Sequence, residues 1–320
     1  MRNIKNRITN FSSIIDYAEY GNAHRMQPTL LLHGCSVIAQ LRKLGQLRTS
    51  ETYLSALRSF MLFREWRDLS LNRLTSEMML EYEAWLQTRG VSMNTVSFYM
   101  RILRALYNRA IESGIAKQHY PFKHVYTGVG KTLKRAVSIN DIRRIKRLDL
   151  SARPALDFAR DMFLFSFYTR GMSFVDMAYL KKTDLHEGVI HYRRRKTGQM
   201  LHIRWERCMQ HIVDKYPDNG TCYLLPIICA EGNDRRQYQN AMRLVNCRLK
   251  RVAVLAGIHV RLTMYVSRHS WASIARSMHI PISVISEGMG HDSEATTQIY
   301  LASLDPAIID RANGHILRLL

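Results

Sequence analysis

One pattern limits the fold of this chain more than any other: a helical spacing of apolar residues that runs through most of it and is interrupted once. In residues 93–112, for example, apolar side chains recur every three or four positions, which predicts a helix with one buried face. The interruption is GVIHYRRRKTGQMLHIRW (residues 188–205), where apolar and polar residues alternate on both sides of KTGQ. Such alternation around a glycine predicts a β-hairpin with Gly198 in its turn. The chain should therefore be mainly α-helical with a small β-sheet.

The same spacing locates the individual helices. It predicts helices at residues 50–65, 76–88, 93–112, 139–148, 155–168, 206–215, 235–256, 268–278, 282–288, 294–302 and 306–319. The last of these opens with Asp305 as a cap and Pro306 at the first helical position, an arrangement that favours a helix start.

The charge of the chain predicts its partner. Lysine and arginine total 47 against 26 acidic residues, a net charge of +21, and a chain this basic is expected to bind a polyanion. The excess is uneven, because residues 117–150 alone carry nine basic and two acidic side chains. A basic connector could lie along a DNA backbone, although it could also be only a solvated linker.

Chain length and this charge distribution together predict the domain organisation. At roughly 150 residues per domain, 320 residues suggest about two domains. We expect a lead-in at residues 1–35, a helical domain at 36–116, a basic linker at 117–138 and a larger domain at 139–320.

Several classes of protein are disfavoured by what the sequence contains. GVGKT (residues 128–132) lacks the first glycine of a phosphate-binding loop, since Val125 stands there. The histidines and five cysteines have no zinc-binding spacing, so we expect neither a metal nor another cofactor. The scattered cysteines suit a reducing compartment, and no apolar run has the length of a signal peptide or membrane span. A cytoplasmic, nucleoid-associated protein is predicted.

Three motifs in the C-terminal half carry the functional argument. MGHDSEATTQIY (residues 289–300) places His291 nine residues before Tyr300, RHSWA begins at Arg268, and Arg170 lies in FYTRGMSFVDMAYLKKTDL. Their order and spacing, with Lys196 in the predicted hairpin turn, resemble the tyrosine recombinase (phage integrase) family, of the mobile-element integrase or invertase type. Any one of these residues alone is more often structural, and the joint order carries the resemblance.

The resemblance implies a fold and a chemistry. The fold would be a C-shaped DNA clamp, with a SAM-like core-binding domain before residue 116 and a DNA breaking-rejoining catalytic domain after it. The chemistry would be cleavage and rejoining of duplex DNA through a 3′-phosphotyrosine, for integration, excision or inversion. In that reading Tyr300 is the nucleophile, Arg170 and Arg268 hold the phosphate, and Lys196 protonates the leaving oxygen. His291 would hydrogen-bond the phosphate or the tyrosine.

The sequence departs from the family pattern at two positions. The second arginine box reads YVSR, so Tyr265 occupies the place of the usual histidine, and we expect its role to be positional. In the first box the nearest acid, Asp176, follows Arg170 by six residues where the family usually has three.

Further residues are expected at the DNA and between protomers. The face of the helix at 93–112 opposite its apolar side bears Ser97, Arg101, Arg104 and Asn108, which could contact DNA or only be soluble. Candidate DNA contacts in the linker and hairpin are Lys131, Lys134, Arg135, Arg193, Arg194 and Arg195. By analogy with the family, residues 306–320 would dock on a neighbour in a homotetramer that holds two DNA duplexes, with accessory DNA-bending factors as further partners. Packing of that helix on its own domain is the alternative.

Two other functions remain open on the sequence alone. A catalytically silent, architectural DNA-binding protein would keep the charge and lose the chemistry. An enzyme like a type IB topoisomerase would use similar chemistry to nick and reseal, so its product would be relaxed DNA without exchanged strands.

Overall fold

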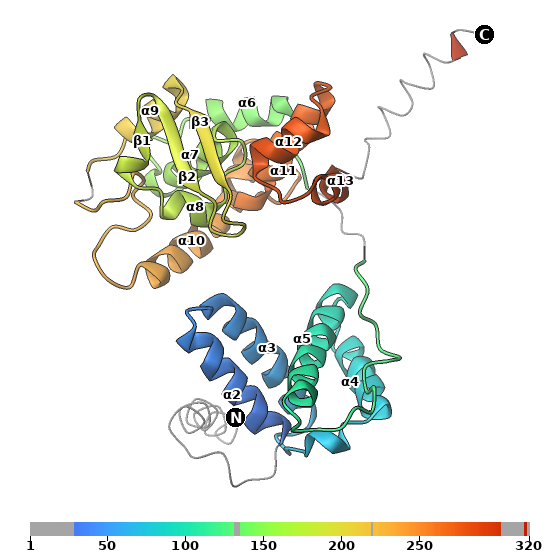
Figure 1. Cartoon of the computed structure of the whole chain (residues 1–320). Coiled ribbons are helices and arrows are strands. Elements are labelled where there is room, and N and C mark those ends of the chain that lie inside the picture. The colour runs from blue at the N-terminus through green and yellow to red at the C-terminus, as the bar shows by residue number, and fades with distance from the viewer. Residues whose placement is uncertain (1–28, 131–134, 219, 302–316, 319–320) are drawn as a thin grey trace. The chain divides into compact units, whose positions relative to one another are not determined.

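The computed structural model describes residues 29–130, 135–218, 220–301 and 317–318 (Figure 1). The chain divides into two compact units, residues 1–132 and 133–320. The predicted class is confirmed, since helices dominate both units and the described strands form one small antiparallel sheet. No helix in the described ranges is long and apolar enough to cross a membrane.

The N-terminal unit is built from helices alone. Its elements are α2 (Leu30–Lys43), α3 (Leu47–Phe63), the 3-10 turn η2 (Leu71–Arg73), α4 (Ser76–Thr88) and α5 (Met93–Glu112). They enclose a core in which Phe60 and Tyr82 meet edge to face, and the Tyr82 hydroxyl donates to Ser59 Oγ at 2.7 Å. The buried aromatic body and its satisfied hydroxyl explain why a tyrosine is tolerated at the centre of this core.

Helix α2 is not among the predicted helices and starts inside the segment expected to be a lead-in. It begins at Leu30, after Thr29 Oγ1 accepts the backbone N–H of Leu32. A Cβ added to Gly34 would lie 2.6 Å from Leu57 Cδ2, so this glycine allows α2 to approach α3 closely. A mid-helix glycine lowers helix propensity by about 1 kcal/mol, and only the packing reveals why it is there.

The prediction for the exposed face of α5 is wrong at one position. Arg101, Arg104 and Asn108 are exposed, but Ser97 is fully buried with the core residues of the helix. A helix advances about 100° per residue, so Ser97 lies beside the buried Val96 and Met100. The solvent-facing stripe is therefore narrower than expected.

The C-terminal unit contains the remaining elements (Figure 1). Its helices are α6 (Ile139–Arg147), α7 (Pro154–Tyr168), α8 (Phe174–Ala178), η3 (Lys182–Asp184), α9 (Arg207–Asp214), α10 (Asp234–Leu255), α11 (Met264–Ser277), α12 (Ile282–Met289) and α13 (Glu294–Leu301). Helix α7 lies at the centre, packed between α10 and α11. Because it is covered on several sides, consecutive residues Met162, Phe163, Leu164 and Phe165 are all buried.

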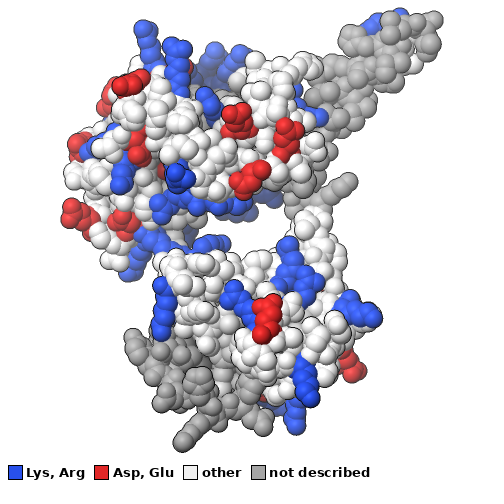
Figure 2. Space-filling view, viewed as in Figure 1, with Lys and Arg blue, Asp and Glu red and all other residues white. Residues whose placement is uncertain are grey.

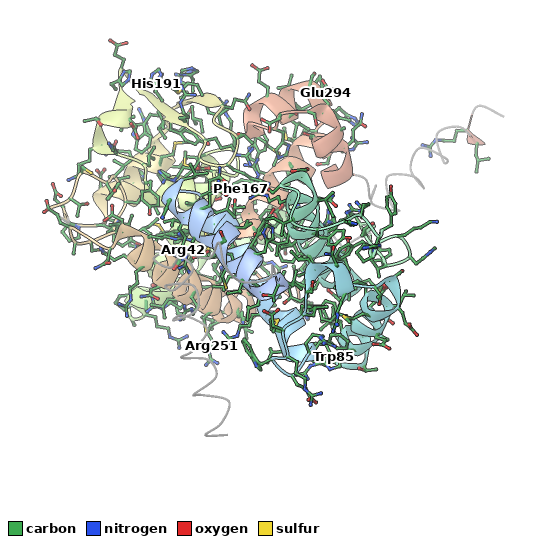
Figure 3. All side chains as sticks on the ribbon, turned by 60° about the horizontal axis from the view of Figure 1, so that its bottom comes forward. Arg42, Trp85, Phe167, His191, Arg251 and Glu294 are labelled. Carbon is green, nitrogen blue, oxygen red and sulfur yellow. The ribbon has the colours of Figure 1, made fainter. Side chains whose placement is uncertain are left out.

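The predicted hairpin is present and belongs to a three-stranded sheet. Strands β1 (Leu185–His186), β2 (Val189–Arg193) and β3 (Met200–Arg204) are antiparallel in that order. Ile190 pairs with Ile203 and points inward, whereas His191 pairs with His202 on the other face; Figure 3 marks His191 on the sheet. The short β1 is not predicted, because two residues are too few to show an alternating pattern.

The ends of two helices matter for the functional residues. Helix α11 begins at Met264, four residues before the predicted start, and so carries both Tyr265 and Arg268. Helix α13 ends at Leu301. The helix predicted at 306–319 lies outside the described residues, apart from the isolated pair 317–318.

Candidate active site

Arg268 is the most deeply placed candidate residue. Its side chain, on the second turn of α11, belongs to a residue only 5% exposed. Nη1 donates to the Gly171 carbonyl at 2.8 Å, and Nη2 donates to the Met289 carbonyl at 2.6 Å. A Cβ on Gly171 would lie 2.8 Å from the Arg268 Cα. The glycine after Arg170 therefore lets the turn between α7 and α8 approach α11 closely enough to hold this guanidinium.

His291 lies next to Arg268 in the turn that follows α12. Its Nε2 is 3.0 Å from Arg268 Nη2, and its Nδ1 is 2.8 Å from Thr297 Oγ1. Burial, followed by the positive charges of Arg268, Arg194 and Lys196, lowers the pKa of His291 to about 4. The imidazole is therefore neutral at physiological pH.

The hairpin reaches the same turn. Gly290, the C-cap of α12 with a φ of 65°, offers its carbonyl to Arg194 Nη1 and, at 3.4 Å, to Thr197 Oγ1. A Cβ there would lie 2.9 Å from Leu201 Cδ1. The positive φ and the close approach of β3 both require glycine at this position.

The three consecutive arginines of the hairpin have different environments. Arg194 is only 6% exposed, and its contact with Gly290 places it inside the candidate site rather than on the exposed strand edge. Arg193 and Arg195 are exposed, as is Lys196 at the tip. All three arginines are candidate DNA contacts in the sequence, and the structure distinguishes Arg194 from the other two by its burial.

Asp176 connects the hairpin to the helical part of the unit. Its buried carboxylate accepts the backbone N–H of Arg195 at 2.9 Å and the hydroxyl of Ser173 at 2.7 Å. The Arg195 guanidinium lies 4.0 Å from the centroid of the Tyr179 ring, in a cation–π contact. These contacts fix the backbone immediately before Lys196.

Arg170 adopts a left-handed backbone conformation, with a φ of 58°. It is half-buried and lines a hollow of about 260 Å³ between β3 and α12, together with Leu201, Glu287 and Gly288. Arg160, the preceding arginine, is paired with Asp157 and Asp161, so a structural role accounts for it. A left-handed non-glycine residue is often found where function requires strain.

Three arginines influence the buried Tyr192 electrostatically. Burial, and next the Asp176 carboxylate, raise the pKa of its hydroxyl, while Arg268, Arg194 and Arg170 act in the opposite direction. Arg170 thus belongs to the same positive region as Arg268 and Arg194.

The two candidate tyrosines are placed differently. Tyr265 is 58% exposed on α11, and its ring meets the His269 ring edge-on with centroids 4.4 Å apart. Tyr300 lies on α13, three residues after Thr297, and its side chain lies outside the described part of the structure.

The structure therefore brings Arg268, His291, Arg194 and Lys196 together around the Gly290 turn. The sequence motifs identified Arg268, His291 and Lys196. They did not identify the contribution of Thr297 or the burial of Arg194. The TT of TTQIY was a signal for Thr297, but nothing in RRR distinguishes its middle residue before the strand faces are known.

Two family models match this chain in sequence. Residues 35–125 match the phage integrase SAM-like domain, and residues 162–306 match the phage integrase family. The chain belongs to the tyrosine recombinase family. Family membership makes this protein a DNA recombinase, an enzyme of site-specific recombination.

Curated relatives agree with this membership. The tyrosine recombinase XerC of Roseiflexus sp. (strain RS-1) is 26% identical over 249 residues, which cover 74% of this recombinase and 75% of the relative. The tyrosine recombinase XerA of Thermococcus kodakarensis is 26% identical over 232 residues, or 71% of this chain and 77% of the relative.

Solved structures share the fold at low sequence identity. A lambda integrase dimer bound to a core site has a TM-score of 0.65 at 15% identity, covering 86% of this recombinase and 95% of that chain. The Tn1549 transposon integrase in complex with a circular-intermediate DNA has a TM-score of 0.62 at 15% identity, covering 89% and 99%. These likenesses support the assigned fold.

Basic side chains lie on both units of the recombinase. Figure 2 shows lysine and arginine spread over each unit, with a band along one edge of the C-terminal unit. Arg101, Arg104 and Arg135 are exposed. Lys131 and Lys134, the other linker candidates, lie outside the described residues.

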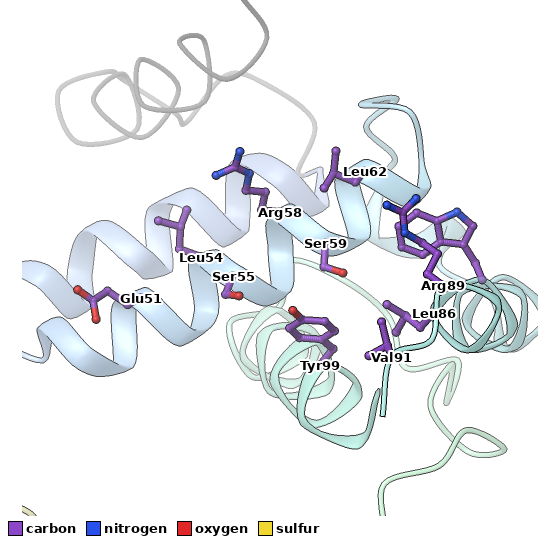
Figure 4. Close-up of a pocket in the computed structure, with 11 residues that line it drawn as sticks. Glu51, Leu54, Ser55, Arg58, Ser59, Leu62, Leu86, Arg89, Val91 and Tyr99 are labelled. Carbon is purple, nitrogen blue, oxygen red and sulfur yellow. The ribbon is translucent and has the colours of Figure 1, made fainter. Parts of the chain in front are cut away.

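The N-terminal unit also has an open groove of about 430 Å³. Leu54, Arg58 and Leu62 line it from α3 (Figure 4). Across the groove, the Arg89 guanidinium lies 4.7 Å from the centroid of the Trp85 ring. The groove thus combines apolar walls with two arginines.

Proposed function

We propose that this recombinase cuts and rejoins duplex DNA by attack of Tyr300 on a phosphodiester, giving a covalent 3′-phosphotyrosyl link. The observation that carries the proposal is the convergence of Arg268, His291 and the Lys196-bearing hairpin around the Gly290 turn, with Tyr300 on the adjoining helix. The link conserves the energy of the broken bond, so that a DNA hydroxyl can reverse the reaction without an external energy source.

The charged residues would stabilise the transition state. Arg170 and Arg268 can each donate to the non-bridging oxygens, where negative charge grows during attack. Arg194, the buried arginine of the hairpin, adds a third positive charge. Removal of one such donor typically costs on the order of a hundredfold or more in rate.

Lys196 would protonate the leaving 5′-oxygen. An ammonium group can release a proton, which a guanidinium cannot do, so none of the neighbouring arginines can substitute. The exposed hairpin tip leaves Lys196 able to approach DNA, while Asp176 holds the backbone before it.

Tyr265 would position the phosphate rather than move a proton, because a phenol is a poor acceptor at neutral pH. Its hydroxyl can still donate a hydrogen bond. Tyr265→Phe should therefore reduce activity without abolishing it. Complete loss in Tyr265→Phe, with Tyr265→His restoring activity and adding an ionisation near pH 6.5, would assign proton transfer to this position instead.

DNA contacts would extend over both units. Arg101 and Arg104 on α5, Arg135 in the linker, and Arg193 and Arg195 on the hairpin are exposed and suited to phosphate contacts. We propose that the two units clamp the duplex and that Lys131 and Lys134 bind along it. Because this binding is electrostatic, it should weaken steeply with salt.

Recombination also requires two sites to be brought together. A lambda integrase tetramer has been solved on a Holliday junction, and we propose a homotetramer on two duplexes here, with residues 306–320 docking between protomers. A chain ending at Leu304 should bind one site normally and fail to pair two. Unchanged recombination by that chain would contradict the docking role.

The proposed mechanism is tested by trapping the intermediate. Wild-type protein and Tyr300→Phe are incubated with DNA from around the gene, without metal or ATP, and denatured. An adduct with the wild type alone supports the tyrosine chemistry and, once its DNA is sequenced, locates the crossover site. Tight binding by both without an adduct would contradict it and favour a silent DNA-binding protein.

The products then identify the kind of reaction. Exchanged strands on a plasmid with two sites support recombination, and the orientation of those sites separates inversion from excision. Relaxed supercoils without exchange would instead indicate a nicking and resealing enzyme.

A further inference from the structure

The contacts of His291 determine where its single proton lies. Every N–H of a guanidinium donates and none accepts. The Nε2 of His291 is 3.0 Å from Arg268 Nη2, so Nε2 must present its lone pair to that arginine. A proton on Nε2 would instead set two donors against each other, the imidazole N–H and the guanidinium N–H.

The other ring nitrogen must then carry the proton. Nδ1 of the neutral ring is a donor, and its partner at 2.8 Å is Thr297 Oγ1. Thr297 is fully buried, which shields this hydrogen bond from water. A hydroxyl both donates and accepts, so it can receive the Nδ1 proton while its own hydrogen points elsewhere.

We propose that Thr297 is a positioning residue that holds neutral His291 in the Nδ1–H tautomer, leaving Nε2 as the proton acceptor of the active site. The proposal rests on the proposed function for its catalytic meaning, although the tautomer itself is a property of the DNA-free protein. The hydrogen bond made by one imidazole nitrogen commonly decides whether the other nitrogen is protonated.

The proposed acceptor explains how this chain can function with YVSR. Tyr265 cannot supply an imidazole at that position, so the phenolic proton of Tyr300 needs another recipient. As the phenol O–H bond breaks, the lone pair of His291 Nε2 gives up its hydrogen bond from Arg268 Nη2 and forms a bond to that hydrogen. The phenolic oxygen bonds to phosphorus, the bond from phosphorus to the 5′-oxygen breaks, and Lys196 gives its proton to that oxygen. Both protons and all electron pairs are accounted for.

The surrounding charges couple this acceptor to the substrate. Among the described residues, the groups that face His291 include Arg268 from α11, Arg194 and Lys196 from the hairpin, and the uncharged Thr297 from α13. The three cations disfavour an imidazolium. A bound phosphodiester brings one negative charge among them and offsets part of that effect. His291 should thus gain basicity when DNA is in place.

The tautomer is tested on the DNA-free protein by nitrogen-15 NMR of the histidine side chains at neutral pH, with His291 assigned by its absence in His291→Gln. We expect a protonated Nδ1 and an unprotonated Nε2 in the wild type. Thr297→Ser keeps the hydroxyl and should give the same pattern, whereas Thr297→Val, nearly equal in shape, should shift His291 towards the Nε2–H form. A wild type with Nε2–H, or an unchanged Thr297→Val, overturns the proposal.

Adduct formation provides the catalytic half of the test. Thr297→Val should form the adduct about a hundredfold more slowly, the range typical of a lost proton acceptor, with DNA binding retained and Thr297→Ser near the wild type. Equal rates for the two variants would contradict the acceptor role. If the wild type itself forms no adduct, the proposed function fails, while the NMR result still decides the tautomer.

Discussion

The Arg195 backbone N–H donates to the Asp176 carboxylate at 2.9 Å, which joins the hairpin turn after β2 to the first turn of α8. Asp176 is buried and also accepts from Ser173. The residue that follows Arg195 is Lys196, so the position of the proposed acid depends on a carboxylate twenty residues earlier in the chain.

Replacement of that carboxylate should loosen the hairpin. Asp176→Ala removes two hydrogen bonds to a charged group, and we expect a loss of about 2 kcal/mol or more in the free energy of unfolding. Asp184→Ala is the control, because Asp184 also accepts a backbone N–H, from Lys181, away from the hairpin tip. Chemical denaturation measures both. Equal losses would argue against a special role for Asp176.

Variants of Arg194 and Arg193 should distinguish a residue of the buried site from a residue on the DNA-binding surface. Arg194→Ala removes a buried guanidinium that contacts Gly290, so it should lower both stability and the rate of adduct formation. Arg193→Ala should leave stability nearly unchanged and reduce the slope of binding affinity against salt by about one phosphate contact. Matching behaviour of the two variants in denaturation and in salt titration would contradict the assigned environments.

Gly290 should tolerate no side chain. Gly290→Ala combines the cost of a left-handed alanine, about 1–2 kcal/mol, with a contact of 2.9 Å to Leu201. Gly257 is the matched control, since its φ is 63° and the nearest atom to an added Cβ is the flexible end of Arg144 at 3.4 Å. Gly290→Ala should therefore be the more destabilised of the two in urea unfolding.

Lys196 should be dispensable when the leaving group needs no proton. Lys196→Ala should cleave ordinary DNA at least a hundredfold more slowly, the usual scale for loss of an acid. A substrate with sulfur in place of the bridging 5′-oxygen leaves readily as a thiolate, so it should restore cleavage by Lys196→Ala. Lys196→Arg should behave like alanine on the oxygen substrate. Failure of the sulfur substrate to rescue the variant would remove Lys196 from this role.

Acid should destabilise the fold partly through His291. Its pKa is about 4 in the folded protein against 6.5 for an ordinary histidine, so between these values the unfolded chain binds a proton that the folded chain does not. Stability therefore falls as the pH drops from about 6.5 to about 4. His33 and His191 also have lowered pKa values, each mainly through burial. The contribution of His291 is the part of the slope that disappears in His291→Gln, measured by unfolding at several pH values.

The candidate site could be located from the sequence because its candidate residues lie in short motifs. The RH pair, MGH and TTQIY keep fixed spacings along helices, and the alternation around KTGQ places Lys196 at a turn. The helical class followed similarly, since apolar residues repeat at the period of a helix. The hydrophobic pattern did not predict β1, because two residues are too few to show a period. It also did not predict the start of α2, where the apolar residues are too uniform to show one.

The sequence alone determined most of the helices, the hairpin and the residues that we propose as the cationic groups and the nucleophile. Only the tertiary structure decided which of three consecutive arginines is buried, that Ser97 faces the core, and which nitrogen of His291 lies against Arg268. The reason is physical: periodicity shows which residues share a face of one element, whereas burial and hydrogen-bond partners come from other elements. The Gly171 and Gly290 turns bring those elements together across about a hundred residues of chain.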